Sequence, residues 1–210
     1  PIGVPTGQEI GENGRSGGVY GTLVPPNPRL APFLRAIVRR GAFEPNLSKF
    51  DLTLEATHHG PVMSLPTMYL EIGSSEKEWK DMKLASIWAE IIIENLSSKA
   101  PDQNKRWILC IGGGHYAPRH RDRLIRSNEL VGHILPSYSL PNVDEEATLH
   151  KFEKVLQAAI SSMKTARPKA EVIAHLDRKS MNSDLRRYII DKLGTFNVEV
   201  VRGKQLLTIE

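Results

Sequence analysis

The chain has 210 residues, 40% of them hydrophobic, so it can bury a full core, and we expect residues 1–210 to form a single domain. Its 28 Lys and Arg against 24 Asp and Glu give a formal charge of +4, which permits a nucleic-acid partner without requiring one. The single cysteine, Cys110, excludes an intrachain disulfide and, with no secretory pattern, favours the cytoplasm; no apolar run approaches the ~20 residues of a membrane-spanning helix.

The first third of the chain passes from loop to helix to alternating segments. Residues 1–28 are rich in glycine and proline and are expected to be mostly loop. From Pro28 to Gly41, apolar residues recur three and four positions apart and basic residues come late, which predicts an amphipathic helix. Residues 51–57 and 67–72 alternate apolar with polar side chains, which predicts two strands.

The rest of the chain alternates helical with strand patterns. Ser75 and Glu78 form a capping box before apolar residues at helical spacing up to Leu96. Further strands are predicted at 107–111, 131–135, 171–176 and 198–201, and further helices at 149–163 and 183–193. This order favours a three-layer α/β/α domain with a mixed, largely parallel sheet.

Five of the seven histidines lie at or beside predicted strands. His58 and His59 follow the first strand, His115 follows three glycines, His133 lies inside a strand and His175 lies near the end of another. Ligands of open α/β sheets bind beyond the carboxyl ends of the strands, so these side chains predict a shared site of metal ligands or general bases. A pair of surface histidines is the alternative for His58 and His59.

Residues 112–114 are all glycine, so the backbone N–H groups of Gly113 and Gly114 can approach an oxyanion or a phosphate. The alternative is a tight structural turn. The segment lacks the spacing of a P-loop or a dinucleotide fingerprint. Arg119 and Arg121 follow closely, and they predict either phosphate contacts or a solvated charged face.

Two acids could complete a site. Asp177 follows a predicted strand, and Glu71 lies near the end of another; either could bind a metal or orient an imidazole, or simply face solvent. A hairpin of residues 51–57 with 67–72 would place His58 and Glu71 at opposite ends of the sheet. No nucleophile elbow is present, and Cys110 in an apolar strand is expected to be inert.

Three stretches, taken together and in this order, resemble one family. They read LEATHHGP at 54–61, PTMYLEIGS at 66–74 and GGGHYAPR at 112–119, with support at 131–133, 137–140 and 174–180. They closely resemble D-aminoacyl-tRNA deacylase of the archaeal and plant type. The resemblance implies a phosphorylase/hydrolase-like α/β/α fold, hydrolysis of D-aminoacyl-tRNA to D-amino acid and tRNA, and zinc dependence. Family members carry a further segment before the equivalent of Pro1, which this chain is expected to lack.

On this resemblance, the tRNA acceptor end carrying a D-amino acid is the expected partner, and a monomer is favoured. The metal shell is expected from His58 or His59, His115, Asp177 and Glu71. His133 or His175 would act as a ligand or in proton transfer, and His58, His59 and His115 are also catalytic candidates. The amides of Gly113 and Gly114 would bind the oxyanion, and Arg119, Arg121 and Lys179 would hold the RNA.

Several alternatives stay open at this point. A tRNA ester is already activated, so a metal-free route assisted by the ribose 2′-hydroxyl is possible. A peptidyl-tRNA hydrolase or a metallopeptidase could use the same kind of fold, and a nucleoside phosphorylase could use the glycines for phosphate. A fragment that binds tRNA without hydrolysing it is the non-enzymatic alternative.

Overall fold

The computed structural model describes residues 23–56, 61–73, 75–102 and 105–206. Four strands form one sheet in the order β2-β1-β3-β4, and every pair is parallel. The strands are β1 Trp107–Ile111, β2 Leu130–Leu135, β3 Val172–Leu176 and β4 Glu199–Val201. The predicted strands at 107–111, 131–135, 171–176 and 198–201 are confirmed. The predicted α/β class with a largely parallel sheet is confirmed, and all four described strands run the same way, so the sheet is parallel rather than mixed.

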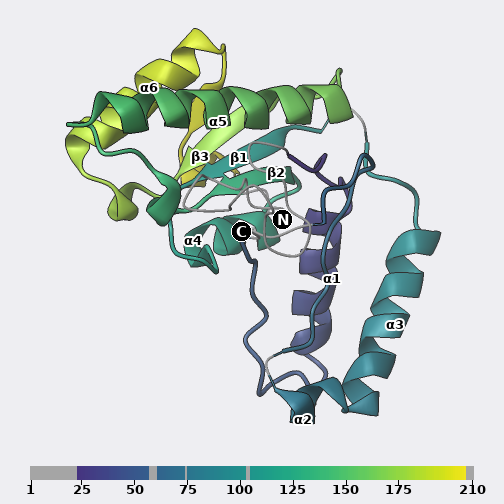
Figure 1. Ribbon diagram of the computed structural model, residues 1–210. Helices are drawn as coiled ribbons and strands as arrows, with labels where there is room; N and C mark the ends of the chain where they lie inside the picture. Colours follow the sequence, from purple (N-terminus) through teal and green to yellow (C-terminus); the bar gives the residue numbers. More distant parts are fainter. Residues whose placement is uncertain (1–22, 57–60, 74, 103–104, 207–210) are drawn as a thin grey trace.

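Helices cover both faces of this sheet (Figure 1). Helix α4 (Pro118–Ile125) joins β1 to β2 on one face, whereas α5 (Glu146–Ala166) and α6 (Ser183–Thr195) lie on the other. The connection from β1 leads to one edge of the sheet, and the chain then returns past β1 to β3. The direction of winding therefore changes between β1 and β3, and ligands of such sheets bind at the carboxyl ends of the strands on either side of this point.

The strands are buried on both faces because both faces are covered. All residues of β1, β2 and β3 are buried. Within β1, Trp107, Leu109 and Ile111 join the core beneath α5 and α6, and Ile108 and Cys110 join the core on the opposite face. Burial also raises the pKa of the Cys110 thiol well above its usual value, so this thiol is not ionised, as the sequence predicted.

Helix α1 (Leu30–Gly41) confirms the predicted amphipathic helix and packs against the face that carries α4. One side chain fixes this docking. The Arg35 guanidinium donates hydrogen bonds to the backbone oxygens of Leu124, Ser127 and Glu129 at 3.1, 3.0 and 3.1 Å. Burial lowers its pKa to about 10, the value of a group still charged at neutral pH.

The long helix predicted from Ser75 to Leu96 is two helices, α2 (Glu76–Trp79) and α3 (Met82–Ser97). The capping box of Ser75 and Glu78 is present and starts α2. The chain then leaves helical geometry at Asp81, whose side chain caps α3. A second strong cap inside the apolar pattern is the reason for the break.

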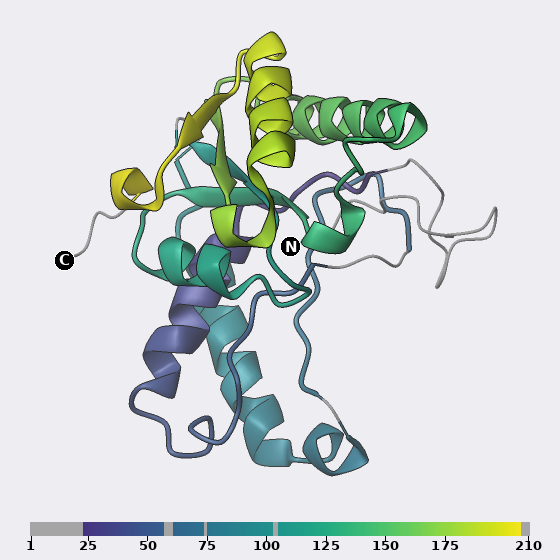
Figure 2. The same ribbon diagram turned by 90° about the vertical axis from the view of Figure 1, so that its left-hand side faces the viewer.

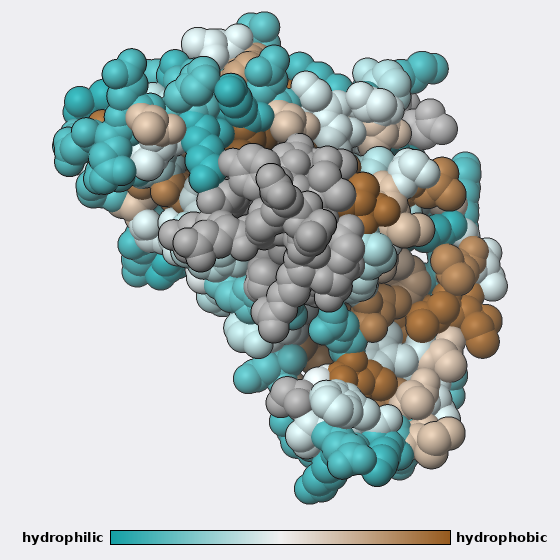
Figure 3. All heavy atoms as spheres, viewed as in Figure 1, coloured by the Kyte–Doolittle hydropathy of each residue, from teal (hydrophilic) through white to brown (hydrophobic). Residues whose placement is uncertain are grey.

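The buried face of α3 also differs from the face that the spacing indicated. Leu84, Ile87 and Ile91 pack against α1 and its neighbours. Apolar side chains on its other faces stay in solvent, namely Met82, Ile93 and Leu96, and so does Trp79 of α2. Figure 3 shows apolar side chains gathered at the lower right, where α3 lies, and a mostly hydrophilic surface over α5 and α6.

The two strands predicted at 51–57 and 67–72 are wrong for the described residues, which are extended but form no strand. Thr67 instead donates its N–H to the Pro25 oxygen at 3.2 Å, in an isolated bridge with residues 25–26. The alternation of residues 51–56 still decides burial, because Leu54 and Ala56 face the core. The described residues of these two segments do not pair in a hairpin.

The remaining elements are short: 3-10 turns at Ser137–Ser139 and Arg178–Ser180, and helix α7 (Gly203–Leu206). Seen from the side, α1, α2 and α3 form a lobe below the sheet, and α5 and α6 lie above it (Figure 2). No helix in the described part of the chain is long and apolar enough to cross a membrane.

Candidate active site

The turn after β1 demands glycine. Gly112 and Gly113 have φ of +88° and +84°, a region that side chains with a Cβ rarely adopt. A Cβ on Gly112 would lie 2.3 Å from the Ser180 Oγ, so the turn also leaves no room for one. The glycine run therefore brings the ends of β1 and β3 into direct backbone contact.

Hydrogen bonds join this turn to its neighbours. The Gly113 N–H donates to the Ser180 Oγ at 2.8 Å, and the Asp177 N–H donates to the Ile111 oxygen at 2.8 Å. The Gly114 N–H has no hydrogen-bond partner among the described residues, and a Cβ there would meet nothing within 4 Å. Of the two amides expected to bind an oxyanion, that of Gly113 is already used, and only that of Gly114 is left for a ligand by the described residues.

His115 lies at the exposed end of this turn, between a carboxylate and a phenol. Its Nε2 is 2.8 Å from the Glu55 Oε1, and its Nδ1 is 3.3 Å from the Tyr138 hydroxyl. The backbone places Glu55 there, because the Ala56 N–H donates to the His115 oxygen at 2.8 Å. Residues 51–56 are thereby held along the glycine turn.

The contacts of His115 assign its proton. Burial, followed by the charge of Glu55, raises the pKa of Tyr138, so the phenol stays protonated and can donate to Nδ1. Because a carboxylate can only accept, the Nε2–H of His115 donates to Glu55. The Nδ1 lone pair is then the acceptor of the array, as in a base oriented by a carboxylate. We call Glu55, His115 and Tyr138 the His115 array.

Sequence reasoning did not single out Glu55 or Tyr138, although both lie in stretches that carry the family resemblance. Glu55 stands three residues before His58 in a segment predicted to end at the site, which is a signal that could have found it. Tyr138 follows β2 by three residues. It lies near His115 because β2 pairs in parallel with β1, so both strands end at the same edge of the sheet.

An open groove of about 680 Å³ begins at Glu55 and runs along the extended segments toward α3. Glu71 lies on its wall together with Glu55, and Trp79, Trp88 and Tyr116 supply aromatic surface. Glu71 therefore shares a groove with the His115 array, contrary to the separation that a hairpin would have imposed. Asp51 also lines the groove, so three carboxylates stand against one cation, Lys49. This negative balance and the aromatic surface suit a ligand that carries one positive charge and an apolar side chain.

His175 is buried against His120, with the two Nδ1 atoms 2.9 Å apart. Burial lowers the pKa of His120 to about 3 and that of His175 to about 4, so both rings are neutral at pH 7. The His120 Nε2–H must donate to the Gly112 oxygen at 3.1 Å, which leaves its Nδ1 as an acceptor. His175 therefore donates from Nδ1 and keeps a lone pair on Nε2.

Asp177 is buried at the start of the turn after β3. Its Oδ1 accepts from the Arg119 guanidinium at 2.8 Å and from the Lys179 N–H at 3.1 Å. The carboxylate is thus engaged with cationic and backbone donors. Arg121 points elsewhere, to the Leu52 oxygen and to an adjacent aspartate. Arg119 and Lys179 therefore share a surface that Arg121 does not join.

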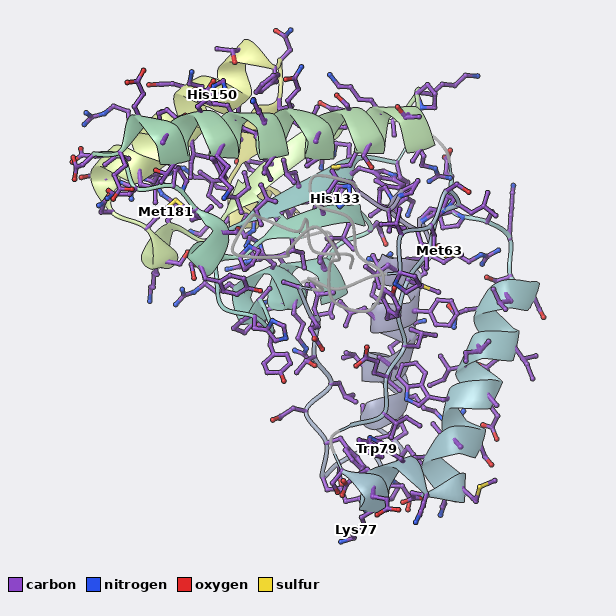
Figure 4. All side chains as sticks on the ribbon, in the orientation of Figure 1. Met63, Lys77, Trp79, His133, His150 and Met181 are labelled. Carbon is purple, nitrogen blue, oxygen red and sulfur yellow. The ribbon has the colours of Figure 1, made fainter. Side chains whose placement is uncertain are left out.

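The other predicted histidines are not brought to the array within the described residues. His133 lies inside β2, fully buried, with Nε2 3.2 Å from the Ser162 Oγ of α5. Figure 4 shows His133 in the sheet layer and His150 on α5. His58 and His59 lie outside the described residues.

No group of three or more His, Cys, Asp and Glu residues that could hold a metal ion occurs among the described residues. Glu55 and His115 are adjacent, but no third ligand joins them from this part of the chain. The described residues by themselves do not fit a zinc shell of His115, Asp177 and Glu71.

Residues 5–201 match the protein family described as D-aminoacyl-tRNA deacylase. The chain belongs to this family. A protein of Arabidopsis thaliana named D-aminoacyl-tRNA deacylase is 34% identical over 218 residues, which cover 95% of this chain and 68% of that protein. A Methanosarcina mazei protein of the same name is 33% identical, covering 96% of this chain and 61% of its own length. The chain thus spans about two thirds of the length of these two relatives, and less of several others.

A solved structure of similar fold exists. The crystal structure of AF0625, titled a conserved protein of unknown function, superposes with a TM-score of 0.70 and 28% sequence identity. The similarity covers 92% of this chain and 64% of that one. The α/β fold of this chain, which the family resemblance implied, is therefore similar to that of a solved structure.

Proposed function

We propose that the chain hydrolyses the ester that joins a D-amino acid to tRNA. The observation that carries the proposal is the 2.8 Å contact of the His115 Nε2 with Glu55, next to the Gly114 amide, which has no partner among the described residues. Ester hydrolysis needs a base and an oxyanion donor that converge on one carbonyl, and this turn holds both. Membership of the deacylase family supplies the substrate class.

In the proposed reaction, the Tyr138 hydroxyl turns away from the Nδ1 of His115, and water then attacks the ester carbonyl while this Nδ1 takes its proton. Glu55 holds the ring through Nε2–H and stabilises the charge that forms on it. The carbonyl oxygen becomes an oxyanion, which the Gly114 N–H binds. When the tetrahedral intermediate collapses, the C–O bond to the ribose breaks and His115 returns the proton to the ribose oxygen. The products are the free D-amino acid and tRNA.

The groove beside the array is where we place the aminoacyl group. Its free α-ammonium would lie near Glu55 and Glu71, and its side chain would lie against Trp88 and Tyr116. A peptidyl-tRNA carries an amide in place of that ammonium and would gain nothing from the two carboxylates. This charge favours a deacylase over a peptidyl-tRNA hydrolase.

Zinc is the cofactor that the family resemblance implies, and it remains part of the proposal. No step above runs through it, because no group of three or more metal-binding side chains occurs among the described residues. When bound, the ion would polarise the carbonyl and acidify water. Metal analysis of the purified protein and of His115→Ala tests this. About one zinc per chain in the wild type and much less in the variant is the expected result; equal contents would remove His115 from the shell.

Hydrolysis itself is tested with D-tyrosyl-tRNA and L-tyrosyl-tRNA as substrates, with and without a chelator, and with an N-blocked L-aminoacyl-tRNA as the peptidyl mimic. We expect release of the D-amino acid to be the fastest. His115→Ala should lower that rate by about 10²–10⁴-fold, because it removes the base. Glu55→Gln, which keeps a hydrogen-bond acceptor without the charge, should lower it by about 10–100-fold.

His150→Ala is the matched control, since this exposed histidine lies on α5 away from the turn. It should leave the rate within about twofold, as expected of a surface substitution. Unchanged turnover in His115→Ala would refute the assignment of the base. Binding of tRNA with no hydrolysis of any ester would instead show a non-catalytic tRNA-binding chain.

A further inference from the structure

A second hollow lies at the carboxyl ends of β3 and β4, on the other side of Asp177 from the glycine turn. It measures about 620 Å³ and is lined by residues 175–179, residues 200–203 and one side of α4. The ends of parallel strands next to a switch point are where such sheets bind ligands. The reaction proposed above makes no use of this pocket.

The pocket is strongly basic. Five cationic side chains line it against two carboxylates; the cations are Arg119, Arg123, Arg178, Lys179 and Arg202. Only Arg119 forms an ion pair with a carboxylate, that of Asp177, within the described part of the chain. Four positive charges thus line one hollow without an ion pair to a described carboxylate, which suits an anionic ligand.

One of these cations is held by a close backbone approach. A Cβ on Gly203 would lie 2.6 Å from the Nε of Arg123, so the guanidinium rests across the glycine at the start of α7. Any larger residue at this position would displace it. The guanidinium therefore lies at the pocket wall, and a guanidinium is a planar fork of donors, the geometry that binds phosphate oxygens in pairs.

The pocket also offers one acceptor. His175 lines it, and the hydrogen bond with His120 leaves a lone pair on the Nε2 of His175. This atom has no partner among the described residues, yet it is not shut off from solvent. An ionised phosphodiester has no proton to donate to it, whereas a hydroxyl group does. A ligand that carries both a phosphate and a hydroxyl uses the cations and the imidazole together.

We infer that this pocket binds a ribose-phosphate unit of the RNA chain, with the phosphate on Arg123 and Arg202 and a ribose hydroxyl on His175. The inference rests on the proposed function, because it makes the pocket the anchor of the same tRNA whose ester lies near His115. Asp177, which contacts both Arg119 and the turn after β3, stands between the two sites. Proteins distinguish RNA from DNA through such contacts with the ribose hydroxyl.

The test measures the affinity of the full chain for an acceptor-stem RNA hairpin by fluorescence anisotropy at about 50 and 200 mM salt. Arg202→Gln and Arg123→Gln should each weaken binding by about 5–20-fold and reduce the salt dependence by about one phosphate contact. Arg187→Gln is the matched control, because this exposed arginine of α6 lies outside the pocket. It should change affinity by less than about twofold. Pocket variants that behave like the control would overturn the inference.

Two further arms separate this inference from its rivals. A hairpin of the same sequence made of DNA should bind several-fold more weakly, and equal affinity would refute the contact of His175 with the ribose. Adenosine monophosphate should not compete with the hairpin at micromolar concentrations; tight competition, abolished by Arg202→Gln while RNA still binds, would assign the pocket to a free nucleotide and refute the RNA anchor.

The same variants test the RNA-binding pocket and the catalytic proposal separately. His115→Ala should lose turnover and still bind the hairpin, whereas Arg202→Gln should raise KM for D-aminoacyl-tRNA with kcat within about threefold. A wild-type chain that binds the hairpin through the pocket without hydrolysing any ester would support the anchor and refute the deacylase. If the wild-type chain hydrolyses the ester and Arg202→Gln leaves KM unaltered, the deacylase proposal is supported and the RNA anchor is refuted.

Discussion

At the scale of single residues, two neighbouring glycines of the turn have opposite requirements. Gly112 has a positive φ and no room for a Cβ, whereas Gly114 faces open space. We expect Gly112→Ala to lower the free energy of unfolding by on the order of 3 kcal/mol, through backbone strain and the clash with Ser180. Gly114→Ala should change it by less than about 0.5 kcal/mol. Urea denaturation of both variants checks this, and equal losses would contradict the geometry of the turn.

At the scale of elements, the break between α2 and α3 depends on one cap. The Asp81 Oδ1 accepts hydrogen bonds from the N–H groups of Lys83 and Leu84 at 3.0 and 3.2 Å. Asp81→Ala should therefore cost about 1 kcal/mol of stability. Glu94→Ala removes an exposed acid from the same helix and should cost less than about 0.5 kcal/mol. Thermal unfolding monitored by circular dichroism compares the two, and similar midpoints would show that the cap contributes nothing.

At the scale of the whole molecule, the buried pair of His120 and His175 links stability to pH. Both pKa values are lower in the folded chain, about 3 and 4, than the ordinary 6.5 of an unfolded histidine. Between pH ~6.5 and ~4 the unfolded chain binds more protons than the folded chain. The contribution of the pair to the free energy of unfolding is therefore complete above pH ~6.5 and is lost as the pH drops toward ~4. We expect a loss on the order of 2 kcal/mol between about pH 7 and 5.

Urea unfolding at the two pH values measures this loss. His120→Asn removes one of the two groups and should flatten the dependence, while His150→Asn on the surface of α5 should leave it as it is. Where His120→Asn does not fold, the pKa values of both rings in the wild type, followed by NMR titration, decide the matter. Ordinary values near 6.5 in the folded chain would contradict the burial of the pair.

The amino-acid sequence by itself determined the order of the elements and the identity of most site segments. Periodicity located α1, α5, α6 and all four strands, because each carries a continuous apolar face or run. The glycines after β1 marked the turn, because positive φ is a local property that glycine alone tolerates well. The single domain over residues 1–210 stays a prediction, and so do the roles of His58 and His59.

The tertiary structure decided which neighbours those segments have. Alternation in residues 51–56 predicts an extended chain but not its neighbour. In the structure the Ala56 N–H donates to the His115 oxygen, and this contact places Glu55 beside the His115 ring. The apolar faces of α3 were ambiguous, and contact with α1 selected one of them. His133 and His175 both lie on buried strands, yet His133 contacts Ser162 of α5, whereas His175 contacts His120 of α4 and lines the pocket at the ends of β3 and β4. Local patterns fix local conformation, whereas the meeting of distant side chains depends on packing of the whole chain.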